Sequence, residues 1–587
     1  MLFRSVACCL LGMLDGALLY GRFVSIPVSI WLFFVNGVTL LVLCYSGLFG
    51  LDMIGVYFSW FHGMFVDFSV NYYFDSSIVF IVFIIFGVSG TILLFSQLYM
   101  FGDTRLFEFL YIISIFVSGM VLLVEASSSF WFLTYWEVIG VCSFLLISFW
   151  SMRLAAVRSG LQAILVNKVG DTFLVLGFAL FFLYNCTDIF LLDFWIYGYI
   201  NYIFGFVILG VLSKSAVVFF HYWLPYAMEG PTPVSALIHA ATLVTAGLFL
   251  VVKLRFLLLN GFMCSILLIL GLIGVVLLAM IAIDQFDVKK LIAYSTLSQI
   301  SFMLLVLVFG DFNTGILYIL VHAVFKSLMF MASGNLIHGL SDQQDLRIFG
   351  GLAKVFSVSY LFIFYACVAM NGVIGSIGFY SKDLIVEWIG NAYIINASFI
   401  HISLLVGLSM TFLYSAYLVY RVFLGIGGRW SFSRSNDDVG LYLTLILLMQ
   451  TWIIYVGGSY FASNLNFNIS GIHVNYLNNL SDVLISNEDY SFSEYSFTVI
   501  TVFLLLLFRY EYSYLAGLRI FSYKFFYDKI VNSTLLRLYE VSSIMNADLL
   551  RLMFYTRYSI SSSKNTYVVR QSIMRIVVCI GIVCLIV

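Results

Sequence analysis

Charged side chains are scarce in this sequence. Asp, Glu, Lys and Arg make up 10% of its 587 residues, against about 25% in soluble domains, while hydrophobic residues make up 63%. This composition excludes a soluble enzyme with one water-facing core and predicts an all-α polytopic membrane protein. The 28 basic and 29 acidic residues nearly cancel, so net charge gives no reason to expect nucleic acid as a partner.

Motifs for metals and nucleotides are also missing. The nine cysteines include no C-x-x-C pair of the kind that binds zinc or iron–sulfur clusters. The sequence has no G-x-G-x-x-G or G-x-x-x-x-G-K-[ST] stretch to hold a nucleotide phosphate. We therefore expect any redox cofactor to lie on another protein.

What the sequence does contain is a succession of about sixteen apolar runs, each long enough for a helix that crosses a bilayer. Lys and Arg gather in the odd-numbered connections between these runs, as Arg105, Arg153 and Lys289 illustrate, and the even-numbered connections carry mainly acidic residues. The positive-inside rule places the odd connections in the matrix or cytoplasm. Lys253 and Arg255 are exceptions, which we expect to snorkel to the interface.

The beginning of the chain bears on its location. Residues 3–21 are apolar and lack a small-residue cleavage site, so we interpret them as the first span. The 60 Phe and 38 Tyr residues have AT-rich codons, which favours an organellar gene. We therefore expect the mitochondrial inner membrane, with the bacterial plasma membrane as the alternative.

Residues 512–566 mix recurring charges with recurring apolar side chains. At about 100° per residue, the charged side chains share one arc of about 100°; they are Lys529, Arg537, Glu540, Asp548 and Arg551. This pattern predicts a lateral amphipathic helix along the membrane or along partner proteins, with an ordinary soluble helical loop as the alternative. One more span is expected at 567–587.

Ionisable residues inside the apolar runs are the candidate functional residues. Glu137, Lys214 and Lys326 lie well within such runs, and Lys382 and Asp383 follow a glycine-rich stretch where we expect the helix to break inside the membrane. Each buried charge costs about 2.5–3.5 kcal/mol. A satisfied buried ion pair explains any one site equally well, but four sites in separate spans favour a polar pathway.

A chain of Glu, Lys and His residues is chemically suited to moving protons. Burial favours the neutral form of a lysine and a nearby carboxylate favours the charged form, so displacing the carboxylate makes the lysine release its proton. His322 lies four residues before Lys326 and shares its helix face. His221 and His239 are further relay candidates because imidazole titrates near neutral pH, although a lone histidine is more often a hydrogen-bonded core residue.

Proline is rare, and three of the four prolines fall between residues 225 and 233. Because proline cannot continue a helix, we expect Lys214 and His239 on consecutive spans that run in opposite directions. The segment 240–247 is rich in small residues, which permits close contact between helices.

At these residues the sequence resembles the chain 5 family of proton-pumping NADH:ubiquinone oxidoreductase, respiratory complex I, whose members are the distal antiporter-like membrane subunits. The resemblance is strongest over residues 55–425, and its most specific segment, GPTPVSALIHAATLVTAG at 230–247, is similar also to bacterial multi-subunit antiporters. The other stretches that carry it are TYWEVIGVCSFLLISFW, NKVGDTF, LSKSAVVFFHYWLP, DVKKLIAYSTLSQISFM, HAVFKSLMFMASGNLIH and GFYSKDLIVEW. A terminal lateral helix favours chain 5 over the shorter sister chains 2 and 4.

The resemblance implies about sixteen transmembrane helices, with two five-helix repeats of inverted topology that each contain a broken helix. The implied division of the chain is N-terminal helices at 1–105, repeats at 106–257 and 258–425, helices 14 and 15 at 426–511, the lateral helix at 512–566 and the final span at 567–587.

The resemblance also implies a proton pathway. Its residues are Glu137, Lys214, His239, His322, Lys326, Lys382, Asp383 and Asp171. In this reading Glu137 pairs with Lys214, His239 links the halves, and Lys382 with Asp383 lies at the exit toward the outer side.

Asp171, in NKVGD, resembles the family's acidic residue that tunes the Glu–Lys pair. Lys168 stands where the family usually has Arg. Lysine keeps the positive charge but lacks the planar fork of arginine, so a bidentate contact is not expected there.

The implied function is that of a core complex I subunit that translocates protons while quinone is reduced elsewhere. The resemblance implies no cofactor or metal on this chain, with NADH, FMN, iron–sulfur clusters and ubiquinone on other subunits. The implied partners are other membrane-arm subunits, especially sister chain 4, and membrane lipids. A subunit of a multi-subunit Na⁺/H⁺ antiporter is the alternative. A haem-copper oxidase core would need close intramembrane histidine pairs, which the seven histidines do not offer.

Overall fold

The computed structural model of the chain describes residues 54–62, 67–74, 76–185, 200–254, 261–309, 312–373 and 397–425, together with single positions within 376–385 and 444–451. All of them belong to the first of two compact units, which spans Met1–Thr501. Outside the described residues lie the first predicted spans, most of 426–511, the predicted lateral helix, the final span and Asp383.

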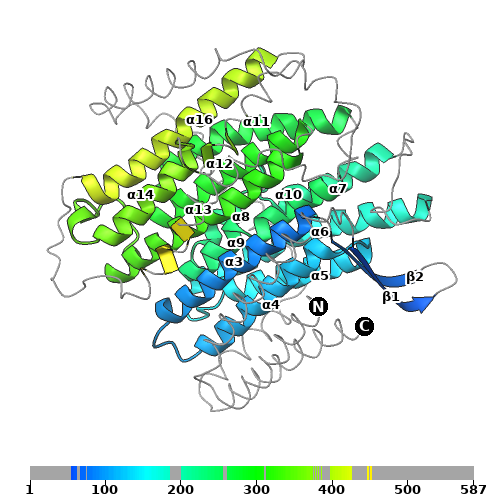
Figure 1. The fold of residues 1–587 in the computed structure, drawn as a ribbon, viewed down its shortest axis with the longest axis horizontal. Helices are drawn as coiled ribbons and strands as arrows, with labels where there is room; N and C mark the ends of the chain where they lie inside the picture. The colour runs from blue at the N-terminus through cyan, green and yellow to red at the C-terminus, as the bar shows by residue number, and fades with distance from the viewer. Residues whose placement is uncertain are drawn as a thin grey trace, which may run out of the picture. The chain divides into compact units, whose positions relative to one another are not determined.

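Helices dominate the described structure (Figure 1). Among the described residues, nine helical segments are long and apolar enough to cross a membrane, which agrees with a polytopic membrane protein. The helices are α3 (Ser76–Tyr99), α4 (Leu106–Glu125), α5 (Ser129–Ile147), α6 (Leu154–Asn185), α7 (Ile200–Lys214), α8 (Trp223–Ala227), α9 (Thr232–Ala240), α10 (Leu243–Lys253), α11 (Gly261–Ile283), α12 (Val288–Val308), α13 (Phe312–Gly339), α14 (Ser357–Asn371) and α16 (Ala397–Val419). A 3-10 turn at Leu352–Lys354 and a π-helical turn at Tyr420–Leu424 complete the set. The predicted total of sixteen spans and the division into repeats stay predictions.

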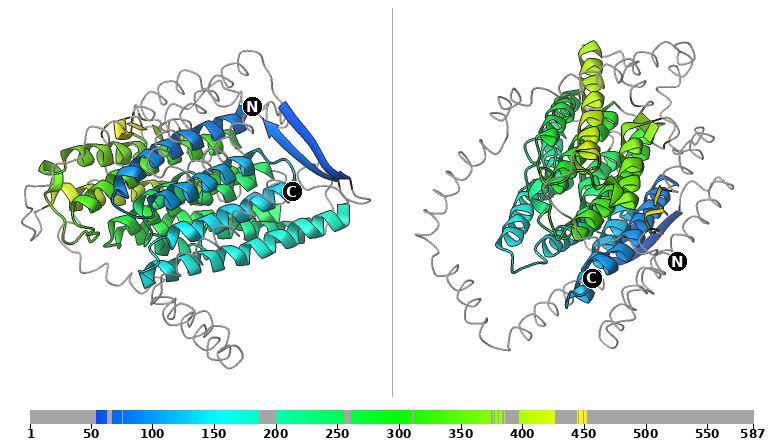
Figure 2. Two further views of the ribbon diagram at one scale, coloured as in Figure 1. Left: turned by 90° about the horizontal axis from the view of Figure 1, so that it is seen from below. Right: turned by 90° about the vertical axis from the view of Figure 1, so that its left-hand side faces the viewer.

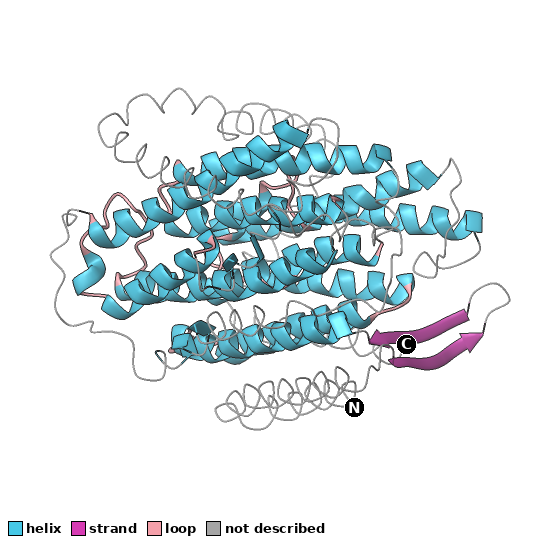
Figure 3. Ribbon diagram, turned by 45° about the horizontal axis from the view of Figure 1, so that its top comes forward, coloured by secondary structure: helices cyan, strands magenta, loops and turns pink. Residues whose placement is uncertain are grey.

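A β-hairpin precedes the helices, so the all-α expectation is wrong at this point (Figure 3). Strand β1 (Ile54–His62) pairs antiparallel with β2 (Asp67–Phe74), and the register joins Ile54 to Phe74 and His62 to Asp67. Both strands are rich in aromatic and β-branched residues, which fit a pleated surface. In a chain that is 18% aromatic, this local enrichment does not stand out.

The contacts between the described helices form two groups, one at each side of the bundle. Contacts join α3 to α4, α4 to α5 and α5 to α6 on one side, and α11 to α12 and α16 on the other. Between these groups α13 packs against both α9 and α3 (Figures 1 and 2). The helix that carries His322 and Lys326 therefore adjoins the helix that carries His239.

Helix α7 stops in the middle of an apolar run. It ends at Lys214, and the helix resumes as α8 only at Trp223. Between them, Ala216 and Phe219 have positive φ angles of 51° and 78°, in the left-handed region that a right-handed helix cannot contain. The break leaves Lys214 at a helix C-terminus, where the helix dipole favours a positive charge.

A second interruption separates α9 from α10 at Ala241 and Thr242. Helix α10 packs closely against α7, since a Cβ added at Gly247 would lie 2.9 Å from the Val211 carbonyl oxygen. The predicted close helix contact at 240–247 is therefore confirmed. Pro231 and Pro233 flank the start of α9, which is where the sequence places a turn.

Candidate functional site

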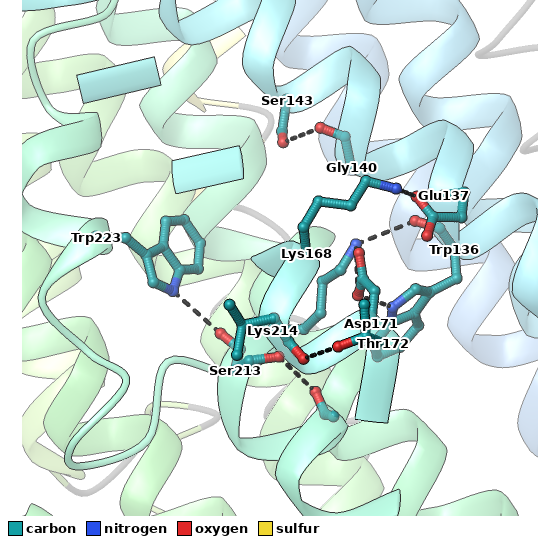
Figure 4. Close-up of polar contacts among 12 residues, drawn as sticks. Trp136, Glu137, Gly140, Ser143, Lys168, Asp171, Thr172, Ser213, Lys214 and Trp223 are labelled. Carbon is teal, nitrogen blue, oxygen red and sulfur yellow. Dashed lines mark hydrogen bonds and ion pairs between the residues drawn. The ribbon is translucent and has the colours of Figure 1, made fainter. Parts of the chain in front are cut away.

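Lys214 lies buried between three helices (Figure 4). Its side chain is 1% exposed, and its Nζ lies 3.8 Å from Oδ1 of Asp171 on α6. The ammonium also donates a hydrogen bond to the Trp136 carbonyl on α5 at 3.1 Å and stands 4.9 Å from the centre of the Trp136 ring. A buried positive charge is thus met by a carboxylate, a carbonyl and an aromatic face.

Asp171 is held from a second direction. Its Oδ1 accepts a hydrogen bond from Nε1 of Trp136 at 2.6 Å. Trp136 therefore contacts both members of the Lys214–Asp171 pair and fixes their geometry. Sequence reasoning missed this role, and the only signal for it is the position of Trp136 directly before Glu137 within an apolar run.

Glu137 has a different partner from the one expected. Its carboxylate forms an ion pair with Lys168 on α6, and the Glu137 and Lys168 side chains are 36% and 47% exposed. Among the described residues no ion pair joins Glu137 to Lys214, so Asp171 takes the place predicted for Glu137. Neighbouring residues on a helix point about 100° apart, which is why Trp136 faces the core and Glu137 faces outward.

The approach of α6 to α7 depends on Gly170. A Cβ added there would lie 1.7 Å from Oγ and 2.3 Å from Cβ of Ser213. Because Gly170 and Ser213 precede Asp171 and Lys214 directly, this contact sets the distance between the two charged residues.

The second half of the candidate pathway centres on Lys326. This residue of α13 is fully buried, and its Nζ donates a hydrogen bond to Oγ of Ser295 on α12 at 2.6 Å. Within the described part of the chain no carboxylate lies within 4.0 Å of Lys326. His322 is also fully buried and lies next to the Ala240 carbonyl, where α9 ends.

His239 lies between the two halves. It is buried, and its ring centre is 6.4 Å from that of Trp223 and 6.2 Å from that of Phe330. Trp223 donates a hydrogen bond from Nε1 to the Ser213 carbonyl at 3.0 Å, next to Lys214. Phe330 follows Lys326 by one helical turn. His239 therefore lies between Trp223 and Phe330, and its role as a link between the halves, which the resemblance implies, stays a prediction.

Lys382 lies near the end of α14. It is 5% exposed, and its Nζ is 5.9 Å from the centre of the Phe302 ring on α12. Helix α14 ends at Asn371, and Gly372 has a positive φ of 75°, a conformation that glycine adopts without strain. Helix α14 therefore ends where the glycine-rich stretch begins, as a break there requires, and the location of this break inside the membrane stays a prediction.

A set of uncharged polar residues also belongs to this region, and sequence reasoning missed it. Gln299 of α12 accepts a hydrogen bond from the Tyr318 hydroxyl and donates one to the Tyr414 hydroxyl at 2.8 Å. All three side chains are fully buried. The signal in the sequence is the polar run Ser295–Gln299 inside an apolar span.

Lys253 is the last residue of α10, and its predicted place at the membrane interface stays a prediction. Its Nζ donates to the carbonyls of Leu123, at 3.3 Å, and Ala126 at the C-terminal end of α4. A cation at that position complements the helix dipole and the free carbonyls of the last turn. Lys253 therefore ties α10 to α4.

No group of three or more metal-ligating side chains occurs among the described residues. The site contains lysines, carboxylates and two histidines, all of which can bind and release protons.

Comparison with known proteins identifies the family of this chain. The family model for the transmembrane part of NADH:quinone oxidoreductase and Mrp antiporters matches residues 126–409. NADH-ubiquinone oxidoreductase chain 5 of Hypocrea jecorina is 33% identical over 507 residues, which cover 84% of this chain and 71% of the relative. Chain 5 of Cryphonectria parasitica is 33% identical over 523 residues, which cover 85% of this chain and 77% of the relative.

A solved structure shares the fold. The structure of an Mrp complex from Dietzia sp. DQ12-45-1b contains a chain that superposes with a TM-score of 0.77 at 19% sequence identity. The match covers 100% of this chain and 63% of that one. The relatives and the family model together show that the chain belongs to the NADH-ubiquinone oxidoreductase chain 5 family.

Proposed function

We propose that this chain is a core membrane subunit of proton-pumping NADH:ubiquinone oxidoreductase and that it carries protons along the residues between Lys214 and Lys382. The observation that carries this proposal is the complete burial of two lysines, Lys214 and Lys326, on either side of His239. Buried ionisable residues in membrane proteins are costly and mark ion or proton pathways.

The first half contains two lysines and two carboxylates, which offers a way to control proton release. Lys168 holds Glu137, and Asp171 faces Lys214. A carboxylate close to a buried lysine favours the ammonium form, and its removal favours loss of the proton. A change in the charge of the Glu137–Lys168 pair would therefore alter how strongly Asp171 holds the proton on Lys214.

His239 provides the step from one half to the other. It adjoins Trp223 on the Lys214 side and Phe330 on the Lys326 side. An imidazole accepts a proton at one nitrogen and gives one up at the other. Protons then pass toward Lys326 with His322, and finally toward Lys382 and Asp383 at the exit.

The exposed Glu137–Lys168 pair indicates where a partner binds. Both residues lie in membrane-spanning helices, and the surrounding surface of α5 and α6 is apolar, with Val141, Leu165 and Val169 exposed. An ion pair that faced lipid would be costly. We propose that a neighbouring membrane-arm subunit, the sister chain 4, covers this face.

The remaining assignments follow from membership in this complex. We propose that the chain lies in the mitochondrial inner membrane and performs no redox catalysis itself. NADH, FMN, the iron–sulfur clusters and ubiquinone are assigned to other subunits. Its contribution to the enzyme is the movement of protons that accompanies quinone reduction elsewhere.

A reconstitution experiment tests this proposal. The complex that contains the chain is purified and placed in liposomes, and NADH and a soluble quinone are added. The proposal predicts uptake of protons that requires both NADH and quinone. Sodium flux driven by a pH difference, without quinone reduction, would contradict it.

A further inference from the structure

One face of α12 contacts Lys326 through Ser295 and Lys382 through Phe302. Ser295 accepts the hydrogen bond of Lys326, and Phe302 lies beneath the ammonium of Lys382. Ser295 and Phe302 are two helical turns apart, which is about 10 Å along the axis. Gln299 lies on the same face between them, one turn beyond Ser295.

Gln299 joins three helices through one amide group. Its Oε1 accepts the hydrogen bond of the Tyr318 hydroxyl on α13, and its Nε2 donates to the Tyr414 hydroxyl on α16 at 2.8 Å. Oγ of Ser298 lies 3.5 Å from the same Tyr414 oxygen. All four side chains are fully buried.

Further polar residues lie between Tyr414 and Lys382, although no hydrogen bond among the described residues joins Tyr414 to the first of them. The next residue on α16, Ser415, exchanges hydrogen bonds of 2.9 and 3.2 Å with Asn371 at the end of α14. The following residue, Gly372, lies so close to Lys382 that an added Cβ would be 3.4 Å from its Cδ. Gln299 therefore stands in the middle of the polar residues between the two lysines.

The chemistry of an amide differs from that of its neighbours. A hydroxyl both accepts and donates a hydrogen bond, so it can pass a proton along a chain, whereas a carboxamide keeps its donors and acceptor fixed. Oε1 of Gln299 accepts the hydrogen bond of the Tyr318 hydroxyl, and Nε2 donates a hydrogen bond to the Tyr414 oxygen. The Tyr414 hydroxyl is then directed at Sδ of Met370, 3.8 Å away.

We propose that Gln299 is a positioning residue that interrupts proton movement between Lys326 and Lys382. A proton crosses only when the contacts of Gln299 with Tyr318 and Tyr414 rearrange, which prevents pumped protons from returning. This inference rests on the proposed function, because it concerns the same pathway, and it adds a barrier within it.

The test replaces Gln299 in the assembled complex in two ways. Gln299→Glu introduces a carboxyl of the same size that can exchange a proton, and Gln299→Met removes both hydrogen bonds without adding a titratable group. Gln299→Glu is expected to raise the passive proton conductance of membrane vesicles several-fold and to lower the number of protons pumped per NADH. Gln299→Met is expected to lower pumping without raising the conductance.

A matched control is Gln450→Glu. Gln450 is equally buried and bonds to Thr91 of α3 at 2.7 Å, not to Tyr318 or Tyr414, so the same chemical change there should leave pumping and conductance unaltered. A merely structural role for Gln299 would give the same effect from its Glu and Met variants and would overturn the proposal. Unchanged conductance and pumping in Gln299→Glu would also overturn it.

Two further variants keep the result decisive. If neither Gln299 variant assembles, Tyr414→Phe removes the hydroxyl to which the amide donates and is expected to lower pumping, so unaltered pumping in that variant contradicts the proposal. Lys326→Met separates this inference from the proposed function. Normal pumping by Lys326→Met overturns the proposed function, whereas lost pumping there together with a normal Gln299→Glu overturns the barrier alone.

Discussion

Nζ of Lys214 lies 3.8 Å from Oδ1 of Asp171, and both side chains are almost completely buried. The pair joins the last residue of α7 to the middle of α6. Because both side chains are buried, each charge is stabilised by the other. Trp136 contacts both members. The state of Lys214 therefore depends on three residues from α5, α6 and α7.

Removing the carboxylate should disable this pair. Asp171→Asn leaves Lys214 buried without a charged partner, which costs about 3–5 kcal/mol if the lysine stays charged. We expect a lower thermal denaturation midpoint of the purified complex and loss of proton pumping. The double variant Asp171→Asn with Lys214→Met removes both charges and should recover the midpoint but not the pumping. A double variant as unstable as the single one would refute the pairing.

The indole of Trp136 should matter through its N–H group. Trp136→Phe keeps an aromatic ring but removes the 2.6 Å hydrogen bond to Asp171, and hydrogen bonds to charged groups contribute about 1.5–3 kcal/mol. We expect reduced pumping at a normal level of assembled complex. Trp150→Phe, beyond the end of α5, is the control and should have no such effect. Equal pumping by both variants would argue against a role for the N–H group.

The spacing of α6 and α7 gives a steric prediction. Gly170→Ala places a methyl group 1.7 Å from Oγ of Ser213, so the helices must separate and Asp171 must move away from Lys214. Pumping should fall sharply. Ser213→Gly removes both atoms in the way, and the double variant Gly170→Ala with Ser213→Gly should recover pumping. Failure of this rescue in an assembled complex would show that the contact does not set the distance.

The exposed pair on α5 and α6 predicts an interface. Lys168→Met leaves Glu137 without its cation on a face that we propose to be covered by a neighbouring subunit. We expect less of the chain to co-purify with the rest of the membrane arm, measured by native electrophoresis. Lys290→Met is the control, since Lys290 pairs with Asp287 at 2.7 Å outside this face. Equal recovery of both variants would contradict the proposed interface.

The spans were predictable because lipid imposes a simple requirement. A run of about 20 apolar residues satisfies it almost regardless of detail, so the helices that carry Glu137, Lys214 and Lys326 follow directly from the sequence. The hairpin at Ile54–Phe74 was not recognised, because its aromatic residues resemble those of the surrounding chain. The positive φ angles at Ala216 and Phe219 could not be predicted, because neither residue is a glycine and no proline lies next to them.

The candidate residues could be identified because a charge within an apolar run costs free energy to bury, but their partners could not be identified. A charge in an apolar run is conspicuous, whereas the choice of Asp171 over Glu137 for Lys214 depends on helix rotation and on the Gly170–Ser213 contact. Gln299, Tyr318 and Tyr414 carry no charge, so the polar run Ser295–Gln299 marks α12 as unusual but does not show that Gln299 bonds to the two tyrosines. Their connection arises only when α12, α13 and α16 come together.

The number of protons translocated per NADH oxidised, measured in vesicles that contain the assembled complex with Lys214→Met, tests the central claim most directly. Lys214→Met keeps an unbranched side chain but cannot carry a proton, and the normal control is Lys290→Met. We expect a clearly lower ratio for Lys214→Met and an unaltered ratio for the control. An unaltered ratio for Lys214→Met, in a complex that assembles and oxidises NADH normally, would contradict it.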